Sequence, residues 1–283
     1  MRHSSRREVL RFAQDDNPAA PGKMGSVIMM LEICVDSVES ALASEAGGAQ
    51  RIELCSDLNE GGITPSAGLI QAVRKHVGID VFVMVRPRGG DSFYTDHEYG
   101  VMQADVLRVK ELGADGIVLG LLDKEGQVDV ERTRELVRLA HPMQVTFHRA
   151  FDMSADLDGS LERVIQTGAH RILTSGGMQT VTQGADRVTH LIDAAKGRIH
   201  IMVGGGIRQE NIRKIALRTR ATEFHCSLRI KTHSPVTFRN HSLKLGAVAN
   251  DEFARYVVLE ENVRGLREAL NKISSGVLQG VYE

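Results

Sequence analysis

Eight short apolar segments recur along the chain after residue 30, and they constrain its fold more than any other feature. Each has the length of a β-strand, and the stretches between them carry apolar residues at helical spacing, as at Leu69, Val73 and Val77. Strands that alternate with helices form parallel βαβ units, and eight such units predict a closed barrel. The predicted strands are residues 31–35, 51–54, 80–85, 116–119, 144–147, 171–173, 199–203 and 222–224.

A weak internal repeat supports this reading. Gly48, Gly113 and Gly168 each end a helical segment just before an even-numbered strand, where glycine suits the left-handed conformation that closes a helix. In the fourth copy the glycine is lost, and the segment begins at Arg220. We therefore predict an α/β fold, a single (β/α)8 TIM barrel, with a doubly wound open sheet as the alternative. In both folds the functional site lies at the carboxyl ends of the strands.

The first 29 residues differ from the rest of the chain. They are rich in arginine, contain Pro18 and Pro21, and have no long apolar run. We expect residues 1–29 to be a disordered extension or a consequence of a mis-called start, although residues 1–12 also resemble an organellar transit peptide. Residues 30–283 match the ~250 residues of a typical TIM barrel. No apolar run approaches the roughly 20 residues of a membrane span, so we expect no membrane partner.

The charge balance and the cysteine count narrow the possible partners. The 35 lysines and arginines nearly equal the 36 aspartates and glutamates, for a net charge of -1. No bulk field therefore draws the protein to nucleic acid, and a charged ligand must be recognised locally. Three cysteines cannot form a disulfide framework, which fits a reducing cytoplasm.

The first two predicted strands carry the same unusual pattern of acid, thiol and acid. Side chains alternate along a strand, so one face of the first strand presents Glu32, Cys34 and Asp36. One face of the second strand presents Glu53, Cys55 and Asp57. The outer face of a barrel strand packs against helices and should be apolar, so we predict that both polar sets point inward.

Other strands end in further titratable residues. We predict that Arg86 after the third strand, His148 after the fifth and His225 in the eighth join Glu32 and Glu53 in a mixed-charge cluster at the barrel mouth. Many titratable groups at strand ends are typical of catalytic and binding sites. The alternative for the acids is structural, since inward glutamates and arginines also neutralise one another in packed barrel interiors.

Two glycine-rich loops follow the sixth and seventh strands. Glycine lets the backbone approach a ligand, and amides at the start of the next helix bind anions, so such loops late in a barrel commonly hold phosphate. The alternative is a pair of tight turns without a ligand. The candidate anion site comprises Arg88, Asp152, Ser175, Gly176, Gly177, Gly204, Gly205 and Gly206.

Six motifs in this order resemble the CutC copper homeostasis family. They are LEICVDS at 31–37, RIELCS at 51–56 with GGITPS at 61–66, VRPRGGD at 85–91, TFHRAFD at 146–152, LTSGG at 173–177 and GGGI at 204–207. The resemblance implies a cytoplasmic TIM barrel that is linked to copper tolerance, is proposed to bind Cu(I), and forms a homo-oligomer, a dimer or a tetramer.

The resemblance and the strand pattern both indicate Cys34 and Cys55, which are the predicted metal ligands. Thiolates favour Cu(I) over harder ions, and matched positions on neighbouring strands, about 4.8 Å apart, bring two sulfurs within reach of one ion. Buried cysteines that act as small apolar residues are the alternative. Cys226 follows His225 directly, so we expect its side chain to point outward, to the helices.

An enzyme is the competing hypothesis, because a copper site does not need this much charge. Glu32 or Glu53 would then be the general base and His148 or His225 the acid. Arg86 and Arg88 would bind the anionic group of a phosphorylated or carboxylated small molecule. A hard-metal site on Glu32, Glu53 and His148 is a third possibility.

The end of the chain carries a helical pattern. Apolar residues recur from residue 252 to residue 270, including Val258, Val263, Leu266 and Leu270. We predict a last helix there, which closes the barrel.

Overall fold

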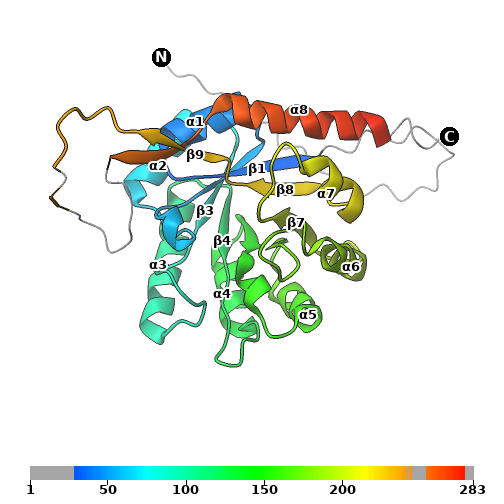
Figure 1. The fold of residues 1–283 in the computed structure, drawn as a ribbon. Coiled ribbons are helices and arrows are strands. Elements are labelled where there is room, and N and C mark those ends of the chain that lie inside the picture. The colour runs from blue at the N-terminus through cyan, green and yellow to red at the C-terminus, as the bar shows by residue number, and fades with distance from the viewer. Residues whose placement is uncertain (1–28, 241, 244–252, 278–283) are drawn as a thin grey trace, which may run out of the picture.

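The computed structural model describes residues 29–240, 242–243 and 253–277, and its centre is a closed barrel of parallel strands (Figure 1). Each barrel strand pairs with its neighbours in sequence, and the first pairs with the eighth. This topology confirms the TIM barrel and excludes the open sheet. The barrel strands are β1 (Met30–Val35), β2 (Arg51–Leu54), β3 (Asp80–Met84), β4 (Gly116–Leu119), β5 (Gln144–Phe147), β6 (Arg171–Thr174), β7 (His200–Gly204) and β8 (Glu223–Cys226).

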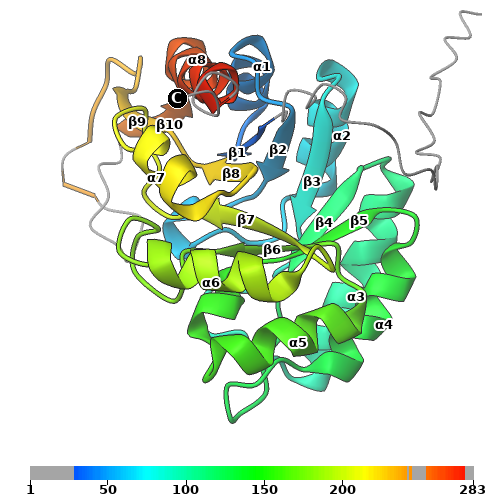
Figure 2. The same ribbon diagram turned by 90° about the vertical axis from the view of Figure 1, so that its right-hand side faces the viewer.

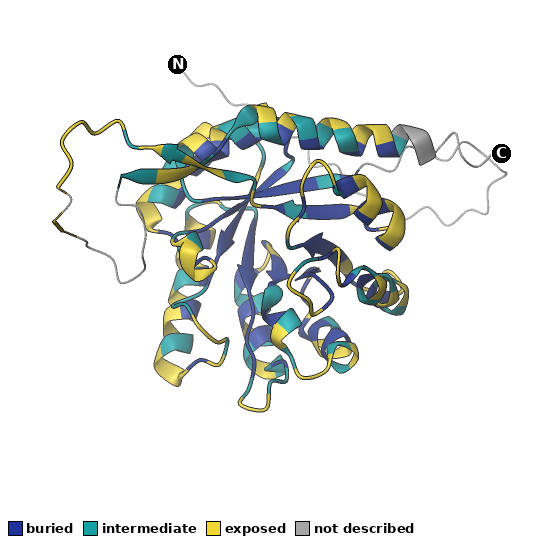
Figure 3. Cartoon of the chain, viewed as in Figure 1, coloured by how far each residue is buried: buried dark blue, intermediate teal, exposed yellow. Residues whose placement is uncertain are grey.

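Helices surround the barrel, and each of the first seven follows the strand of the same number (Figure 2). The barrel strands are largely buried, whereas the helices expose their outer faces (Figure 3). The helices are α1 (Val38–Ala46), α2 (Ala67–His76), α3 (Asp96–Glu111), α4 (Val130–Ala140), α5 (Leu157–Thr167), α6 (Ala185–Ala195), α7 (Ile212–Thr219) and α8 (Glu260–Val277), with short 3-10 helices η1 (Leu58–Glu60) and η2 (Arg149–Met153).

Local sequence signals fix where these helices begin and end. The Ser37 and Ser66 side chains accept hydrogen bonds from the first-turn amides of α1 and α2, and Thr95 forms a capping box with Glu98 on α3. At the other end, the repeat glycines follow α1, α3 and α5 with positive φ angles of 92°, 78° and 82°. The fourth copy of the repeat lacks the glycine, but Arg220, which follows α7, adopts the same left-handed conformation, with a φ of 61°.

The alternation predicted for the first strands places apolar and polar side chains on opposite faces. Leu31, Ile33 and Val35 belong to the large apolar cluster that also contains the helix residues. Cys34 and Cys55 belong to a separate small cluster with Phe82, Met84 and Val118. Residues of this second cluster lie inside the barrel, at the positions that alternate with the outward-facing ones.

The end of the chain differs from the expectation. Ala254–Val258 is a strand, β10, rather than the start of a helix, and it pairs antiparallel with β9 (Arg229–His233) beside the barrel (Figure 1). The segment contains Tyr256, Val257 and Val258, and aromatic and β-branched residues favour a strand when a partner strand is at hand. The helical pattern is correct from Glu260 onward, where α8 packs against α1 and α7.

Two further predictions concern the ends of the chain and the membrane. Of the predicted extension 1–29, residues 1–28 lie outside the described residues. Met29 is buried against the barrel. None of the helices in the described part of the chain combines the length and apolar character that crossing a bilayer requires.

Candidate functional site

Four charged side chains fill the barrel interior near the amino ends of the strands. Arg51 forms ion pairs with Glu32 and, at 2.8 Å, with Glu223, and Arg171 pairs with the same Glu223. Both guanidinium groups lie over the ring of Phe82, with centroid distances of 4.8 and 5.5 Å. We call Glu32, Arg51, Arg171 and Glu223 the interior ion network.

Pairing within this network sets the charge of Glu32. Burial alone would raise the pKa of this carboxyl, but Arg51 and His225 lower it to about 2. Glu32 is therefore ionised, and its two carboxylate oxygens contact Arg51 and His225. These contacts with Arg51 and His225 match the neutralisation alternative for this acid.

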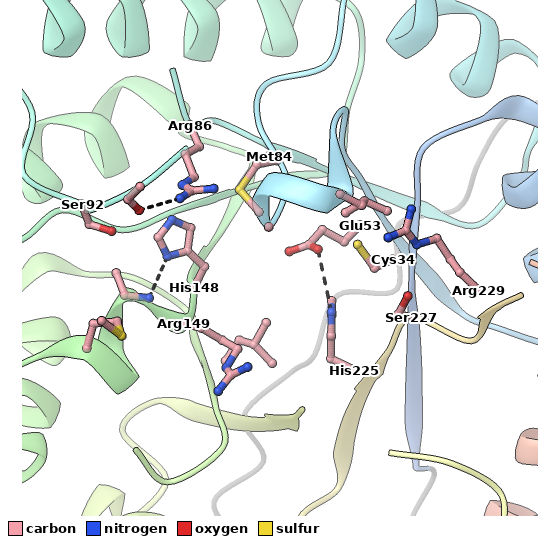
Figure 4. Close-up of a pocket in the computed structure, with 16 residues that line it drawn as sticks. Cys34, Glu53, Met84, Arg86, Ser92, His148, Arg149, His225, Ser227 and Arg229 are labelled. Atoms are coloured by element: carbon pink, nitrogen blue, oxygen red, sulfur yellow. Dashed lines mark hydrogen bonds and ion pairs between the residues drawn. The ribbon is translucent and has the colours of Figure 1, made fainter. Parts of the chain in front are cut away.

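Above the network, at the carboxyl ends of the strands, a cavity of 380 Å³ opens to solvent (Figure 4). This is the position that both candidate folds predicted. Its lining combines apolar side chains, such as Leu58 and Leu173, with charged, polar and sulfur-containing ones: Cys34, Glu53, Met84, Arg86, Ser92, His148, Arg149, His225, Ser227 and Arg229.

Two thiols meet on one side of the cavity. Cys34 on β1 and Cys55, just past the end of β2, place their sulfurs 3.8 Å apart, and both residues are buried. The strands do not pair these cysteines directly, because Cys34 lies opposite Glu53. The loop after β2 closes over the pair at Gly62, which has a φ of 90° and whose added Cβ would lie 3.0 Å from the Cys55 sulfur.

Without a metal both thiols are protonated at neutral pH. The hydrogen bond with Cys55, together with burial, raises the pKa of Cys34 well above its ordinary value. The hydrogen bond with Cys34 lowers the pKa of Cys55, but burial and the nearby Glu53 outweigh it and raise that pKa to about 12.

Glu53 and His225 connect the thiols to the ion network. The Cys55 thiol donates a hydrogen bond of 3.6 Å to Glu53 Oε2, and His225 Nε2 lies 3.8 Å from the same oxygen. His225 Nδ1 lies 2.7 Å from Glu32. Burial lowers the pKa of His225, but the two carboxylates raise it well above its ordinary value, so this imidazole is cationic at neutral pH. Burial raises the pKa of Glu53.

His148 lies across the cavity from Glu53 (Figure 4). It is 7% exposed, and its Nδ1 accepts a 3.0 Å hydrogen bond from the backbone N–H of Ala150. Burial and the charge of Arg86 lower its pKa to about 3, so the ring is neutral. Gly120 provides the space for this ring, because an added Cβ there would lie 2.5 Å from it.

The arginines of the cavity differ in what neutralises them. Arg86 donates to the carbonyls of Glu60, Gly62 and Gly90, at 2.8 to 2.9 Å, and these acceptors carry no formal charge. Arg149 pairs with Asp152 at 2.7 Å. Arg229 pairs with Asp36 at 3.2 Å.

Arg88, predicted as an anion ligand, binds its own loop. It pairs with Glu98 at 2.6 Å and with Asp91 at 3.1 Å, and its Nη2 donates to the carbonyl of Phe93. It is not among the residues that line the cavity.

The loop after β6 already binds an anion, which is a side chain of the protein itself. The Asp152 carboxylate accepts hydrogen bonds from the backbone amides of Ser175, at 3.0 Å, and Gly177, at 2.9 Å, and from the hydroxyls of Thr174 and Ser175. Asp152 thus occupies the place that the sequence assigned to a bound phosphate. Gly176 packs against the backbone of Gly184, since an added Cβ would lie 2.5 Å from that carbonyl oxygen.

The glycines after β7 make close contacts rather than line the cavity. An added Cβ at Gly204 would lie 2.7 Å from Leu173, one at Gly205 would lie 3.2 Å from Ser175, and one at Gly206 would lie 3.1 Å from Thr180. None of the three belongs to the described cavity lining. Their small size serves the packing of this loop against the loop after β6.

Two predicted carboxylates are not in the cluster. Asp36 lies past the end of β1 and pairs with Arg229, and Asp57 is exposed with a φ of 46°. The alternation that predicted them to point inward ends with the strands, at Val35 and Leu54. Cys226 packs in the outer apolar cluster, as predicted.

Several residues of the cavity lining were not predicted as site residues, among them Arg149, Arg229 and Met84. Arg149 follows His148, and strict alternation would turn it outward, but the chain enters η2 there and turns it into the cavity. Arg229 lies past β8 in a strand that the sequence analysis missed. Met84 ends β3 at the inward position of the alternation, a signal that the sequence did contain.

Among the residues that the structure describes, two groups of side chains offer atoms close enough together to hold a metal ion. One is Cys34, Glu53 and Cys55, and the other is Glu32, Glu53 and His225; within each, the ligand atoms lie within 4.8 Å of one another. The hard-metal set predicted from the sequence contained His148 instead, which lies across the cavity. Two sulfurs make the first group the softer site.

Comparison with known proteins identifies the family. Residues 29–230 match the model of the CutC family. The chain belongs to this family. The match covers the barrel strands and both Cys34 and Cys55, and it ends within β9.

CutC relatives occur in animals and bacteria. The chain is 45% identical over 276 residues to the "Copper homeostasis protein cutC homolog" of Homo sapiens, with 97% of both chains covered. It is 49% identical over 250 residues to the Mus musculus protein of the same name, with 88% of this chain and 90% of the relative covered. A CutC family protein of Chromobacterium violaceum is 44% identical, with 86% of this chain and 98% of the relative covered.

Solved structures agree with the CutC assignment. The putative copper homeostasis protein CutC from Streptococcus agalactiae has a TM-score of 0.67 and 33% identity, covering 70% of this chain and 98% of its own. An aldolase, QR15, has a TM-score of 0.53 at 17% identity, with 72% of this chain and 92% of its own covered, which shows the shared fold alone.

Proposed function

We propose that this CutC-family protein binds one Cu(I) ion between the sulfurs of Cys34 and Cys55. The observation that carries the proposal is the 3.8 Å separation of these two sulfurs at the cavity wall. Cys34 lines the cavity, so an ion can reach the pair from solvent. Soft thiolate sulfur favours Cu(I) over Mg²⁺ and Ca²⁺, which prefer oxygen ligands.

The sulfur separation also indicates the number of ligands. If each metal–sulfur bond is about 2.3 Å long, as for thiolates on zinc, a separation of 3.8 Å corresponds to an angle of roughly 110° at the ion. A linear two-sulfur site would need the sulfurs about 4.6 Å apart, at twice that bond length. The geometry therefore favours a third ligand.

Met84 supports such a site. Its side chain packs in the same interior cluster as the two cysteines and lines the cavity. A thioether is a soft, uncharged ligand that suits Cu(I). Because both thiols are protonated in the metal-free protein, copper binding displaces their protons, and Glu53 is placed to accept that of Cys55.

We place this activity in the cytoplasm. The three cysteines are free thiols, and two of them lie within contact distance without a disulfide. A reducing compartment preserves such a pair, whereas an oxidising one favours its oxidation.

An anaerobic Cu(I) titration against a competing chelator tests the proposal. The wild type should bind one equivalent, and Cys34→Ser and Cys55→Ser should each weaken binding at least a hundredfold. Cys226→Ser is the matched control, because it removes a buried thiol that points to the helices. Wild-type binding that survives loss of both Cys34 and Cys55 would overturn the assignment.

A further inference from the structure

Two buried polar atoms at the cavity have no hydrogen-bond partner within the protein. They are Glu53 Oε1 and His148 Nε2. Both residues line the cavity and face one another across it (Figure 4). Leaving such an atom unsatisfied costs about 1–3 kcal/mol, so an unpartnered pair in one cavity indicates a ligand that supplies the missing partners.

His148 presents a hydrogen-bond donor of fixed direction. Its Nδ1 accepts from the Ala150 N–H, so the proton of the neutral ring is on Nε2. The low pKa of this imidazole, about 3, keeps the ring in that neutral form across the physiological range. A ligand must therefore offer an acceptor oxygen to Nε2–H.

Glu53 presents an acceptor on the opposite wall. Its Oε2 is the oxygen near Cys55 and His225, which leaves Oε1 for a ligand. A hydroxyl group donates one hydrogen bond to a carboxylate oxygen without adding charge.

The charge on the His148 side of the cavity is positive. Arg86 and Arg149 flank His148 (Figure 4), and Arg86 is held by carbonyls rather than by a carboxylate. The hydrogen bonds of Arg149 use Nε and Nη2, which leaves Nη1 for a ligand. A carboxylate matches both the charge and the acceptor requirement of this side.

We propose that the cavity binds a small hydroxycarboxylate, whose carboxylate contacts His148 Nε2–H and Arg149 while a hydroxyl donates to Glu53 Oε1. The volume of the cavity, 380 Å³, lies in the range of small-molecule sites. The glycine-loop amides of Ser175 and Gly177 are occupied by Asp152, which argues against a phosphate held there. His148 and Arg149 are in neither metal-competent group; Glu53 is in both, but it offers Oε1 to the ligand, whereas its Oε2 is the oxygen near Cys55.

Calorimetric titration of the metal-free, reduced protein at pH 7 tests the site with defined probes. D-gluconate, D-tartrate and glycolate represent hydroxycarboxylates of six, four and two carbons. D-sorbitol lacks the carboxylate of gluconate, hexanoate lacks its hydroxyls, and inorganic phosphate tests the other anion. At least one hydroxycarboxylate should bind with one-to-one stoichiometry, and sorbitol, hexanoate and phosphate should each bind at least tenfold more weakly.

Variants assign the contacts. His148→Phe should weaken binding of the tightest probe at least tenfold, as should His148→Asn, which retains an acceptor for the Ala150 N–H. His170→Phe is the matched control, because its Nδ1 also accepts from a backbone amide, that of Val145, away from the cavity. Melting temperatures verify that each variant is folded.

Three results would overturn the proposal: no binding by any of the three hydroxycarboxylates, equal binding of sorbitol or phosphate, or unchanged affinity in both folded His148 variants. Cys34→Ser separates this site from the copper site, since it should weaken Cu(I) binding at least a hundredfold and leave probe affinity within threefold.

Discussion

The two ends of the barrel interior contain the same kinds of charged residue but differ in whether the polar atoms of these residues have partners. Near the amino ends, the carboxylates of Glu32 and Glu223 lie within ion-pair distance of Arg51 and Arg171. At the carboxyl ends, Glu53 and His148 each retain a buried atom without a partner. Charge inside a barrel is therefore not by itself a sign of function.

The unpaired atoms distinguish the functional end from the structural one. A fully paired buried network rigidifies the fold, because each member is held by several others. An unpaired buried group persists when it serves a ligand or a reaction. On this criterion we assign a structural role to the interior ion network and propose the cavity above it as the site.

The largest predicted effect is on Arg51. Arg51→Met removes the cation that the buried carboxylates of Glu32 and Glu223 share and leaves each with fewer cationic partners, so the free energy of unfolding should fall by about 3–5 kcal/mol. Urea denaturation measures it. The control is Arg198→Met, whose partner Glu162 is 52% exposed and whose loss should cost about 0–1 kcal/mol. If the two substitutions lowered the free energy of unfolding equally, this would contradict the structural role assigned to the interior ion network.

A matched pair of glutamates sharpens the comparison. Glu32→Gln breaks bonds to Arg51 and His225 and should lower the free energy of unfolding by about 3 kcal/mol. Glu53→Gln makes the same chemical change one strand away, where the carboxylate has fewer partners, and should cost about 1 kcal/mol. Urea denaturation of both variants measures the difference. A larger effect at Glu53 would reverse our assignment of the two ends.

The pH dependence of stability tests the state of His148. The folded pKa of about 3 lies below the ordinary value of 6.5, so the unfolded chain binds the proton more tightly, and stability falls as pH decreases from 6.5 toward 3. Between pH 6.5 and pH 4.5 this contribution is roughly 2 kcal/mol. His148→Phe should lack it, which urea denaturation at the two pH values measures. Parallel slopes for the variant and the wild type would show that the ring is not held neutral.

The smallest predicted effect is on Arg88. Its partners are a 73% exposed Asp91 and the partly exposed Glu98, so Arg88→Gln should change the free energy of unfolding by less than about 1 kcal/mol. Cu(I) affinity should stay within twofold of the wild type, because Arg88 does not line the cavity. A large loss of Cu(I) affinity would place Arg88 in the site after all.

The sequence predicts the barrel well because its signals are local and repeated. Strand and helix periods, caps such as Ser37 and the repeat glycines all fix elements within a few residues. The inward positions of Cys34 and Glu53 follow from the same alternation, and the cavity confirms them.

The errors arise where the backbone leaves its regular period or where a partner comes from far along the chain. Asp57 lies past the strand end, and Arg149 turns inward only because η2 begins there. No local pattern shows that Asp152 reaches the amides of the loop after β6, so that loop looked like a phosphate site. Which acids are paired depends on Arg51 and Arg171, from strands β2 and β6.

Copper K-edge X-ray absorption of the Cu(I)-loaded protein tests the central claim most directly, since it reports the atoms bound to the ion. The account predicts at least two sulfur neighbours at about 2.3 Å in the wild type, and loss of this sulfur shell when Cys34 and Cys55 are both replaced by serine. A wild-type spectrum with nitrogen and oxygen neighbours alone would contradict it.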